Sequence, residues 1–193
     1  MNTKTPFSSI AGIQNLFEKW RQLGHKKLPC GTELIASVPD GGNEEWVHVV
    51  YPGLSHQQLH RLQELLQSPI PGGLRSFYRR CAGMSLWRGA FRVYGYNCDQ
   101  HGVSEYPRYP DSVLRLNHEL DALGWMPKAA FAFAENSWDM SVHVVGLGSD
   151  PHTVHRCDRR TGEVMETHPN VWSCIAARLY RVDELSMDPQ PVA

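Results

Sequence analysis

The fold class is decided by residues 129–167, which read AAFAFAENSWDMSVHVVGLGSDPHTVHRCDRRTGEVMET. Short runs rich in β-branched and aromatic residues follow one another here, and Gly162 can supply the positive φ of a bulged hairpin turn. The predicted strands are residues 129–134, 140–146, 153–157 and 163–167. Strands that cluster without regular alternation with helices favour a mostly antiparallel sheet.

Outward from this stretch, apolar periodicity and turn residues predict the other elements. Helices are predicted at 8–24, 55–68, 71–83, 111–123 and 172–185. A β-hairpin is predicted from the runs 34–38 and 46–51, a further strand at 89–96, and a long surface loop at 97–110. This order predicts an α+β fold in one domain, residues 1–193, with helices packed against the sheet.

Several helix ends carry specific signals. Ser55 followed by Gln58 predicts a capping box, Asp111 can cap the helix at 111–123, and Gly124 fits the end of that helix. Gly83 is predicted to close the helix that Pro71 leads, with Cys81 on the apolar face of that helix.

Composition narrows the possible functions. The 193 residues contain 19 Lys and Arg against 20 Asp and Glu, so the net charge of -1 offers no bulk attraction to nucleic acid or to an acidic membrane. No apolar run approaches the ~20 residues that span a bilayer, and the N-terminus lacks a secretory signal, so we expect a cytoplasmic protein. Five cysteines without a CxxC motif predict reduced thiols.

Enzyme signatures fail for physical reasons. The segment from Gly83 to Trp87 begins like a nucleophile elbow, but tryptophan replaces the closing glycine and the segment follows a predicted helix. The segment from Gly146 begins like a dinucleotide-binding loop, but Pro151 replaces its last glycine and no helix follows. We therefore predict that the chain is not an enzyme and binds no cofactor.

Two groups of residues that contain histidines are candidate metal ligands. His56 and His60 lie one helical turn apart but lack the glutamate of an HExxH motif. A better set is His152, His155, Cys157 and His168, which lie on or beside one predicted hairpin. The prediction is no metal site, because scattered histidines on a hairpin are far more often polar surface; if a metal binds, these four are its ligands.

Aromatic residues and arginines in loops are the better functional signal, because such residues contribute much of the energy of protein interfaces. The predicted partner-binding residues are Trp87, Arg88, Tyr106, Arg108, Tyr109, Trp138 and Asp139. For each of these aromatic residues there is an equally good alternative: the side chain covers the edge of the core and contacts no partner.

An ordered series of short motifs resembles the SUKH superfamily, which includes fungal cell-wall synthesis regulators (SMI/KNR-like proteins) and many bacterial immunity proteins. The motifs span residues 55–186 and comprise Ile70-Pro71, Leu74, Phe77-Tyr78, Ala82-Gly83, Val93-Tyr94-Gly95, Pro127, Phe131-Ala132-Phe133-Ala134, Trp138-Asp139 and Arg160-Thr161-Gly162-Glu163-Val164. The sequence departs from the family pattern at two places. Ala82 stands where the family often has asparagine, and residues 135–139 differ from the acidic or glycine-rich segment that usually follows the Phe-Ala strand.

The resemblance implies a curved, mainly antiparallel sheet with helices on one side and a core at 55–186, on which residues 8–51 pack. The sequence itself predicts a frayed tail at 187–193. It implies a non-enzymatic immunity protein that neutralises a bacterial toxin, encoded nearby, by direct protein binding, with no membrane or direct nucleic-acid partner. Two alternatives are a regulatory scaffold with several partners and a metal-dependent hydrolase that uses the four ligands above.

Overall fold

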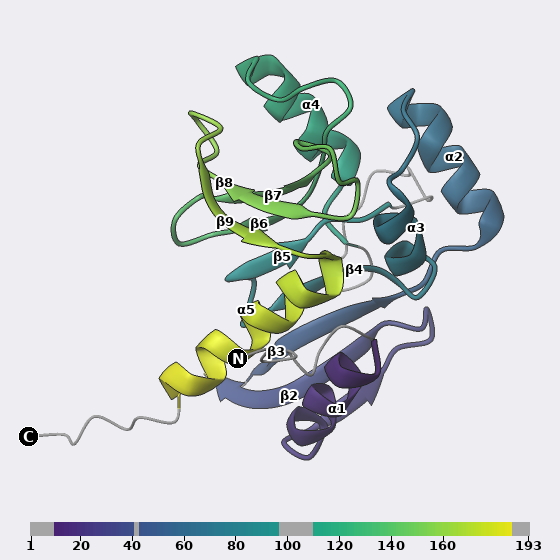
Figure 1. Cartoon of the computed structure of the whole chain (residues 1–193). Coiled ribbons are helices and arrows are strands. Elements are labelled where there is room, and N and C mark those ends of the chain that lie inside the picture. The colour runs from purple at the N-terminus through teal and green to yellow at the C-terminus, as the bar shows by residue number, and fades with distance from the viewer. Residues whose placement is uncertain (1–9, 41–42, 97–109, 187–193) are drawn as a thin grey trace, which may run out of the picture.

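The computed structural model describes residues 10–40, 43–96 and 110–186, which form a nine-stranded sheet and five helices (Figure 1). The strands are β1 (His25–Lys27), β2 (Glu33–Asp40), β3 (Asn43–Pro52), β4 (Cys81–Leu86), β5 (Phe91–Val93), β6 (Phe131–Asn136), β7 (Val142–Val145), β8 (Val154–Cys157) and β9 (Val164–His168). The helices are α1 (Ile10–Arg21), α2 (His56–Leu66), α3 (Gly72–Tyr78), α4 (Val113–Leu123) and α5 (Val171–Ser186).

Every strand pairs antiparallel with the strands before and after it in the chain, so the sheet is a continuous meander from β1 to β9. The α+β class and the antiparallel sheet predicted from the sequence are therefore confirmed. The sequence missed two strands: β4, which is described below, and β1, whose residues are all exposed and carry no apolar alternation. It exists because its backbone pairs with β2, from His25↔Ile35 to Lys27↔Glu33.

The capping box predicted for α2 is present. The Ser55 hydroxyl accepts a hydrogen bond from the Gln58 backbone N–H at 3.2 Å, and the Gln58 side chain accepts one from the Ser55 backbone N–H at 2.8 Å. These bonds satisfy two amide donors that a helix start otherwise leaves unpaired. The helix then buries Leu59 and Leu62.

The predicted helix at 71–83 is too long. Helix α3 ends at Tyr78, and Cys81 and Gly83 belong to β4, in which all six residues are buried. The spacing of Cys81 fits a helical face, but pairing with β3 and β5 on both sides determines the structure. Gly83 lies so close to β5 that a Cβ atom there would be 2.7 Å from the Val93 carbonyl oxygen.

A second correction concerns the start of α4. Ser112, not Asp111, is its N-cap, because the Ser112 hydroxyl accepts from the Arg115 backbone N–H at 3.4 Å. Gly124 ends the helix in the left-handed conformation with φ 78°, as its position predicts.

Helix α5 packs between elements from both ends of the chain. It lies across the front of the sheet, with α1 below it and the β8–β9 hairpin above it (Figure 1), and it contacts α1, α3 and β9. Its buried face includes Ile175 and Leu179. Among the described helices, none combines the length and the apolarity that crossing a bilayer requires.

Candidate functional site

Three hairpin turns lie at the same end of the sheet and bring four of the predicted partner-binding residues together. They are the β4–β5 turn (87–90), the β6–β7 turn (137–140) and the β8–β9 turn (158–163), which we call the turn edge. The strand register places them there, since Phe91 pairs with Asn136 and Val142 pairs with Cys157. Trp87, Arg88, Trp138 and Asp139 all lie on this edge, whereas Tyr106, Arg108 and Tyr109 lie outside the described residues.

The β4–β5 turn has an unusual backbone. Trp87 and Arg88 have φ of 54° and 56°, and the Gly89 N–H donates to the Leu86 carbonyl at 3.1 Å. This is the type I′ geometry, which asparagine and glycine normally supply. A non-glycine residue in this region costs on the order of 1 kcal/mol and persists only where its surroundings hold it. Here the Arg88 N–H donates to the Val47 carbonyl at 2.9 Å, and Arg88 forms an ion pair with Glu45.

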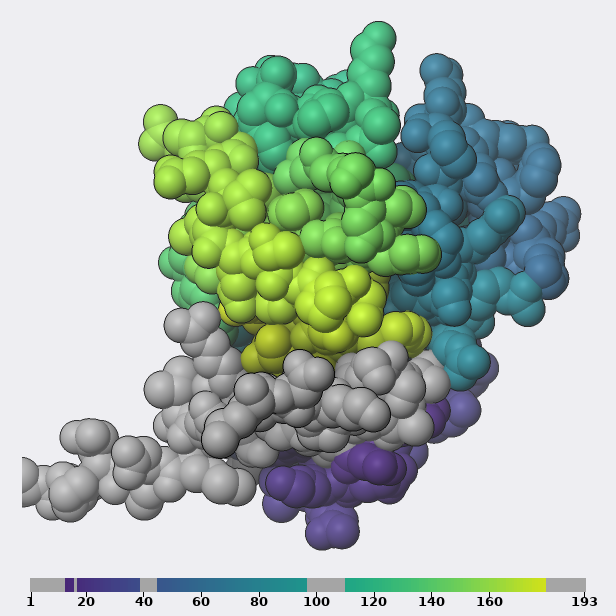
Figure 2. Space-filling view, viewed as in Figure 1, coloured from purple at the N-terminus to yellow at the C-terminus, as the bar shows by residue number. Residues whose placement is uncertain are grey.

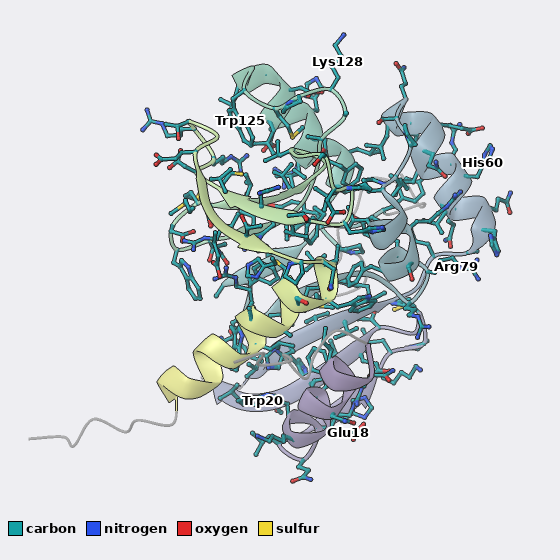
Figure 3. All side chains as sticks on the ribbon, viewed as in Figure 1. Glu18, Trp20, His60, Arg79, Trp125 and Lys128 are labelled. Atoms are coloured by element: carbon teal, nitrogen blue, oxygen red, sulfur yellow. The ribbon has the colours of Figure 1, made fainter. Side chains whose placement is uncertain are left out.

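The Trp87 side chain points inward. Its ring lies edge-on to Trp20 of α1, with ring centroids 5.0 Å apart, and to His48 of β3, with centroids 4.6 Å apart. The Trp87 indole N–H is buried without a hydrogen-bond partner. Trp87 thus occupies the core-edge position that the sequence left open as an alternative, and Trp20 is seen below α5 in Figure 3.

The β6–β7 turn presents the most exposed apolar side chains of the turn edge. Trp138 is 56% exposed and Met140 is 51% exposed. Ser137 joins this turn to the β4–β5 turn, because its backbone N–H donates to the Ala90 carbonyl at 2.9 Å. Asp139 accepts from the Ser141 N–H at 2.9 Å and forms an ion pair with Arg156 at 2.6 Å. Partial burial opposes ionisation of Asp139, but these bonds hold its pKa below its ordinary value.

The β8–β9 turn is braced against α4 and the loop that follows it. The Trp125 indole N–H donates to the Arg159 carbonyl at 2.8 Å, and the Trp125 ring lies against Gly162, which has φ 74° as predicted. Arg159 forms ion pairs with Glu119 of α4, at 2.6 Å, and with Glu135 of β6. Figure 3 shows Trp125 beside α4 and near this turn.

The four candidate metal ligands suggested by the sequence do not converge among the described residues. His155 pairs with Thr167, and the neighbouring pair is Val154 with His168, so His155 and His168 lie on opposite faces of the hairpin. His152 is exposed, and Cys157 is buried on the face of His155. The metal-dependent hydrolase alternative, which requires these four side chains to meet, therefore lacks that metal site among the described residues.

A different group of ligand-type side chains does converge. His143 of β7, His168 of β9 and Cys174 of α5 each offer a ligand atom, and these atoms all lie within 4.8 Å of one another. All three residues are buried, and Cys174 Sγ lies 3.2 Å from His143 Nδ1. Sequence reasoning missed this group, which we call the HHC cluster. The one available signal was a histidine between two valines of a predicted strand.

Burial determines the protonation of the HHC cluster. It lowers the pKa of His143 well below the ordinary value, and it also lowers that of His168, against the attraction of Glu166. Burial raises the pKa of Cys174 to about 12. Near neutral pH the two imidazoles are therefore uncharged, and the Cys174 thiol can donate to His143.

An acidic residue links the HHC cluster to the turn edge. Glu166 forms ion pairs with Arg156, at 3.1 Å, and with Arg178 of α5, and its Oε1 lies 3.4 Å from His168 Nε2. Because Arg156 also pairs with Asp139, one chain of charges runs from the β6–β7 turn to the buried histidines. Partial burial opposes ionisation of Glu166, but the two arginines keep its pKa below the ordinary value.

A separate surface cleft lies between α2 and α3. It has a volume of about 480 Å³ and is lined by His56, Leu59, Gly72, Arg75, Ser76 and Arg79. Figure 3 shows Arg79 and His60 on the outer side of these helices, away from α5. His56 and His60 are both exposed.

Comparison with the known protein families found no match, and comparison with curated proteins found none either.

Proposed function

We propose that this chain is a non-enzymatic protein-binding module whose partner contacts the turn edge. The observation that carries the proposal is the exposure of Trp138 and Met140 on a turn that hydrogen bonds and ion pairs brace from both sides. Tryptophan on a protein surface is the residue type most enriched among the energetic centres of interfaces. A site already held in place loses little conformational entropy when it binds.

The bracing of Trp138 has identifiable parts. On one side Ser137 donates to Ala90, and on the other Asp139 pairs with Arg156 of β8. The strained β4–β5 turn next to it carries Arg88, whose side chain is half exposed. An aromatic anchor flanked by both signs of charge fits a partner surface with an apolar pocket and a polar rim.

As the partner we propose a bacterial toxin encoded beside this chain, which the chain neutralises by covering the toxin's active surface. The resemblance to the SUKH superfamily and the lack of an enzyme motif support this class of function, which needs complementary shape and charge alone. The proposal places the chain in the cytoplasm, where a delivered toxin acts. A regulatory scaffold with several cellular partners is the alternative, and it would use the same edge.

Co-expression with the neighbouring gene product tests the proposal. We expect the chain to protect cells from that product and to co-purify with it. Trp138→Ala should weaken binding by about 30-fold or more, as a binding hot spot does. Leu23→Ala is the matched control, because Leu23 has a similar exposure, 60%, and lies two residues after the end of α1, outside the turn edge.

Two results would contradict the proposal. A neighbouring product that is harmless, or that neither binds nor is neutralised, removes the toxin partner. Capture of several housekeeping enzymes in its place would favour the scaffold alternative. Unchanged binding by folded Trp138→Ala, or equal weakening by Leu23→Ala, would remove the turn edge as the contact surface.

A further inference from the structure

We propose that the HHC cluster binds a zinc-class cation, with His143, His168 and Cys174 as its protein ligands. The three side chains come from β7, β9 and α5, and their ligand atoms lie within 4.8 Å of one another. In Figure 2 the yellow-green atoms of the β8–β9 hairpin and the yellow atoms of the start of α5 lie side by side. The three ligand residues are buried at a junction of three elements, and none of them belongs to the turn edge.

The donor set selects the kind of cation. Two imidazole nitrogens and one thiolate sulfur suit Zn²⁺ and its close relatives, whereas Mg²⁺ and Ca²⁺ prefer oxygen ligands. Around a tetrahedral ion with bonds of about 2.0–2.3 Å, neighbouring ligand atoms lie roughly 3.3–3.8 Å apart. Cys174 Sγ and His143 Nδ1 are 3.2 Å apart, so one pair is almost at that spacing and small side-chain rotations would bring the third atom in.

The His143 ring presents Nδ1, the atom beside Cys174 Sγ, to the cluster. Its other nitrogen, Nε2, is buried and has no hydrogen-bond partner. The ring is surrounded by Phe91 and Phe133, which offer no acceptor. A buried polar atom without a partner costs about 1–3 kcal/mol, so the protein retains an imidazole whose bonding capacity it does not use internally.

The charges around the cluster can accommodate a cation. Arg178 lies 3.4 Å from His168 Nε2 and Arg156 lies nearby, and both oppose a further positive charge. Glu166 pairs with both arginines, and Asp139 pairs with Arg156. When Zn²⁺ binds, the Cys174 S–H bond breaks, the sulfur electron pair goes to the metal, and the proton leaves to solvent. The resulting thiolate adds one negative charge to the site.

The three protein ligands leave the fourth position of a tetrahedral ion open. Glu166 Oε1 lies 3.4 Å from His168 Nε2, but Glu166 pairs with Arg156 and Arg178 and is not one of the converging ligand residues. The bound cation would join the start of α5 to β7 and β9. Since metal binding of this kind stabilises the folded state, the role that follows is a structural clamp.

Metal titration of the full chain, purified without a histidine tag, tests the proposal. We expect one equivalent of Zn²⁺ to bind and to raise the unfolding temperature, and one equivalent of Co²⁺ to produce a thiolate-to-cobalt charge-transfer absorption. Cys174→Ala should abolish that absorption and weaken Zn²⁺ binding by at least about 100-fold, more than loss of an outer-shell group does. His168→Gln should weaken Zn²⁺ binding similarly, and it provides the same test if the Cys174→Ala protein does not fold.

Cys157→Ala and His155→Gln are the matched controls, because these residues are of the same types and lie on the other face of the β8–β9 hairpin. Both should bind metal as the unmodified chain does. Failure to take up Zn²⁺ or Co²⁺ would overturn the proposal. So would stoichiometric binding that survives in Cys174→Ala or His168→Gln, or that is lost in either control. None of these results bears on the partner-binding proposal, which uses the turn edge.

Discussion

Asn117 of α4 hydrogen-bonds both backbone groups of Ala132 in β6. Its Oδ1 accepts from the Ala132 N–H at 2.9 Å, and its Nδ2 donates to the Ala132 carbonyl at 2.8 Å and to the Val113 carbonyl at 2.8 Å. β5 ends at Val93, whose partner is Ala134, so Ala132 lies beyond the last ladder pair with that strand. The Asn117 amide therefore takes the place of a neighbouring strand and joins α4 to the sheet.

Replacing Asn117 should destabilise the fold strongly. Asn117→Leu leaves a buried N–H and a buried carbonyl of Ala132 unpaired, and we expect the free energy of unfolding to fall by about 2–4 kcal/mol. Urea denaturation measures this. His118→Leu is the control, because His118 is the exposed next residue of α4, and it should change stability by less than about 0.5 kcal/mol. Equal stabilities of the two variants would show that the Asn117 bonds contribute nothing.

Stability should fall in acid partly because of His48. This residue is fully buried between Phe17, Trp20 and Trp87, and burial lowers its pKa from 6.5 to about 3. The folded state therefore keeps His48 neutral, while the unfolded chain takes up a proton below about pH 6.5. The resulting loss of stability grows as the pH falls from about 6.5 towards 3, by at most about 1.4 kcal/mol per pH unit.

His48→Phe should remove this share of the acid sensitivity. Both ring nitrogens of His48 lack hydrogen-bond partners, so an apolar ring of similar shape should leave stability at pH 7.5 unchanged or raise it. Urea denaturation of the two proteins at pH 7.5, 5.5 and 4.5 provides the comparison. The difference between them should widen in acid, and curves that stay parallel across this range would contradict the assignment.

The capping box of α2 should contribute measurably. Ser55→Ala removes the acceptor for the Gln58 N–H, and we expect the free energy of unfolding to fall by about 1 kcal/mol. Gln57→Ala is a suitable control, since Gln57 is exposed in the same helical turn and makes no part of the box. A Ser55→Ala protein as stable as the control would show that the box adds nothing to the folded protein.

Gly162 should tolerate a side chain less well than Gly124 does. Both have positive φ, of 74° and 78°, but a Cβ at Gly162 would lie 2.6 Å from the Trp125 ring, whereas a Cβ at Gly124 meets nothing within 4 Å. Gly124→Ala should therefore cost about 1 kcal/mol from backbone strain alone, and Gly162→Ala about 1–3 kcal/mol more. Thermal unfolding of both variants checks the order, and a reversed order would show that the Trp125 contact does not restrict Gly162.

Local signals were sufficient for several features of this chain. The capping box at Ser55, the turn at Gly162 and the end of α4 at Gly124 were predicted, and the structure contains each of them. The same holds for the hairpins β2–β3 and β8–β9. These features depend on hydrogen bonds and backbone angles among residues a few positions apart, so the residue types alone specify them.

Other features depend on contacts between distant parts of the chain. Residues 81–83 fit the predicted helix at 71–83, yet residues 81–86 form a strand because β3 and β5 offer hydrogen-bond partners on both sides. The direction of Trp87 is determined by Trp20 and His48. The HHC cluster brings together His143, His168 and Cys174, whose separation in the sequence matches no known metal-binding motif.

The sequence by itself thus determined the α+β class, the antiparallel sheet and most element positions, because periodicity and turn chemistry act within each segment. Only the tertiary structure decided which side chains contact one another. It brought His143, His168 and Cys174 together, and it supplied the contacts that hold the turn with Trp138 in place. Such meetings depend on strand register and on the docking of α5 against the sheet, and these follow from the energy of the packed molecule as a whole.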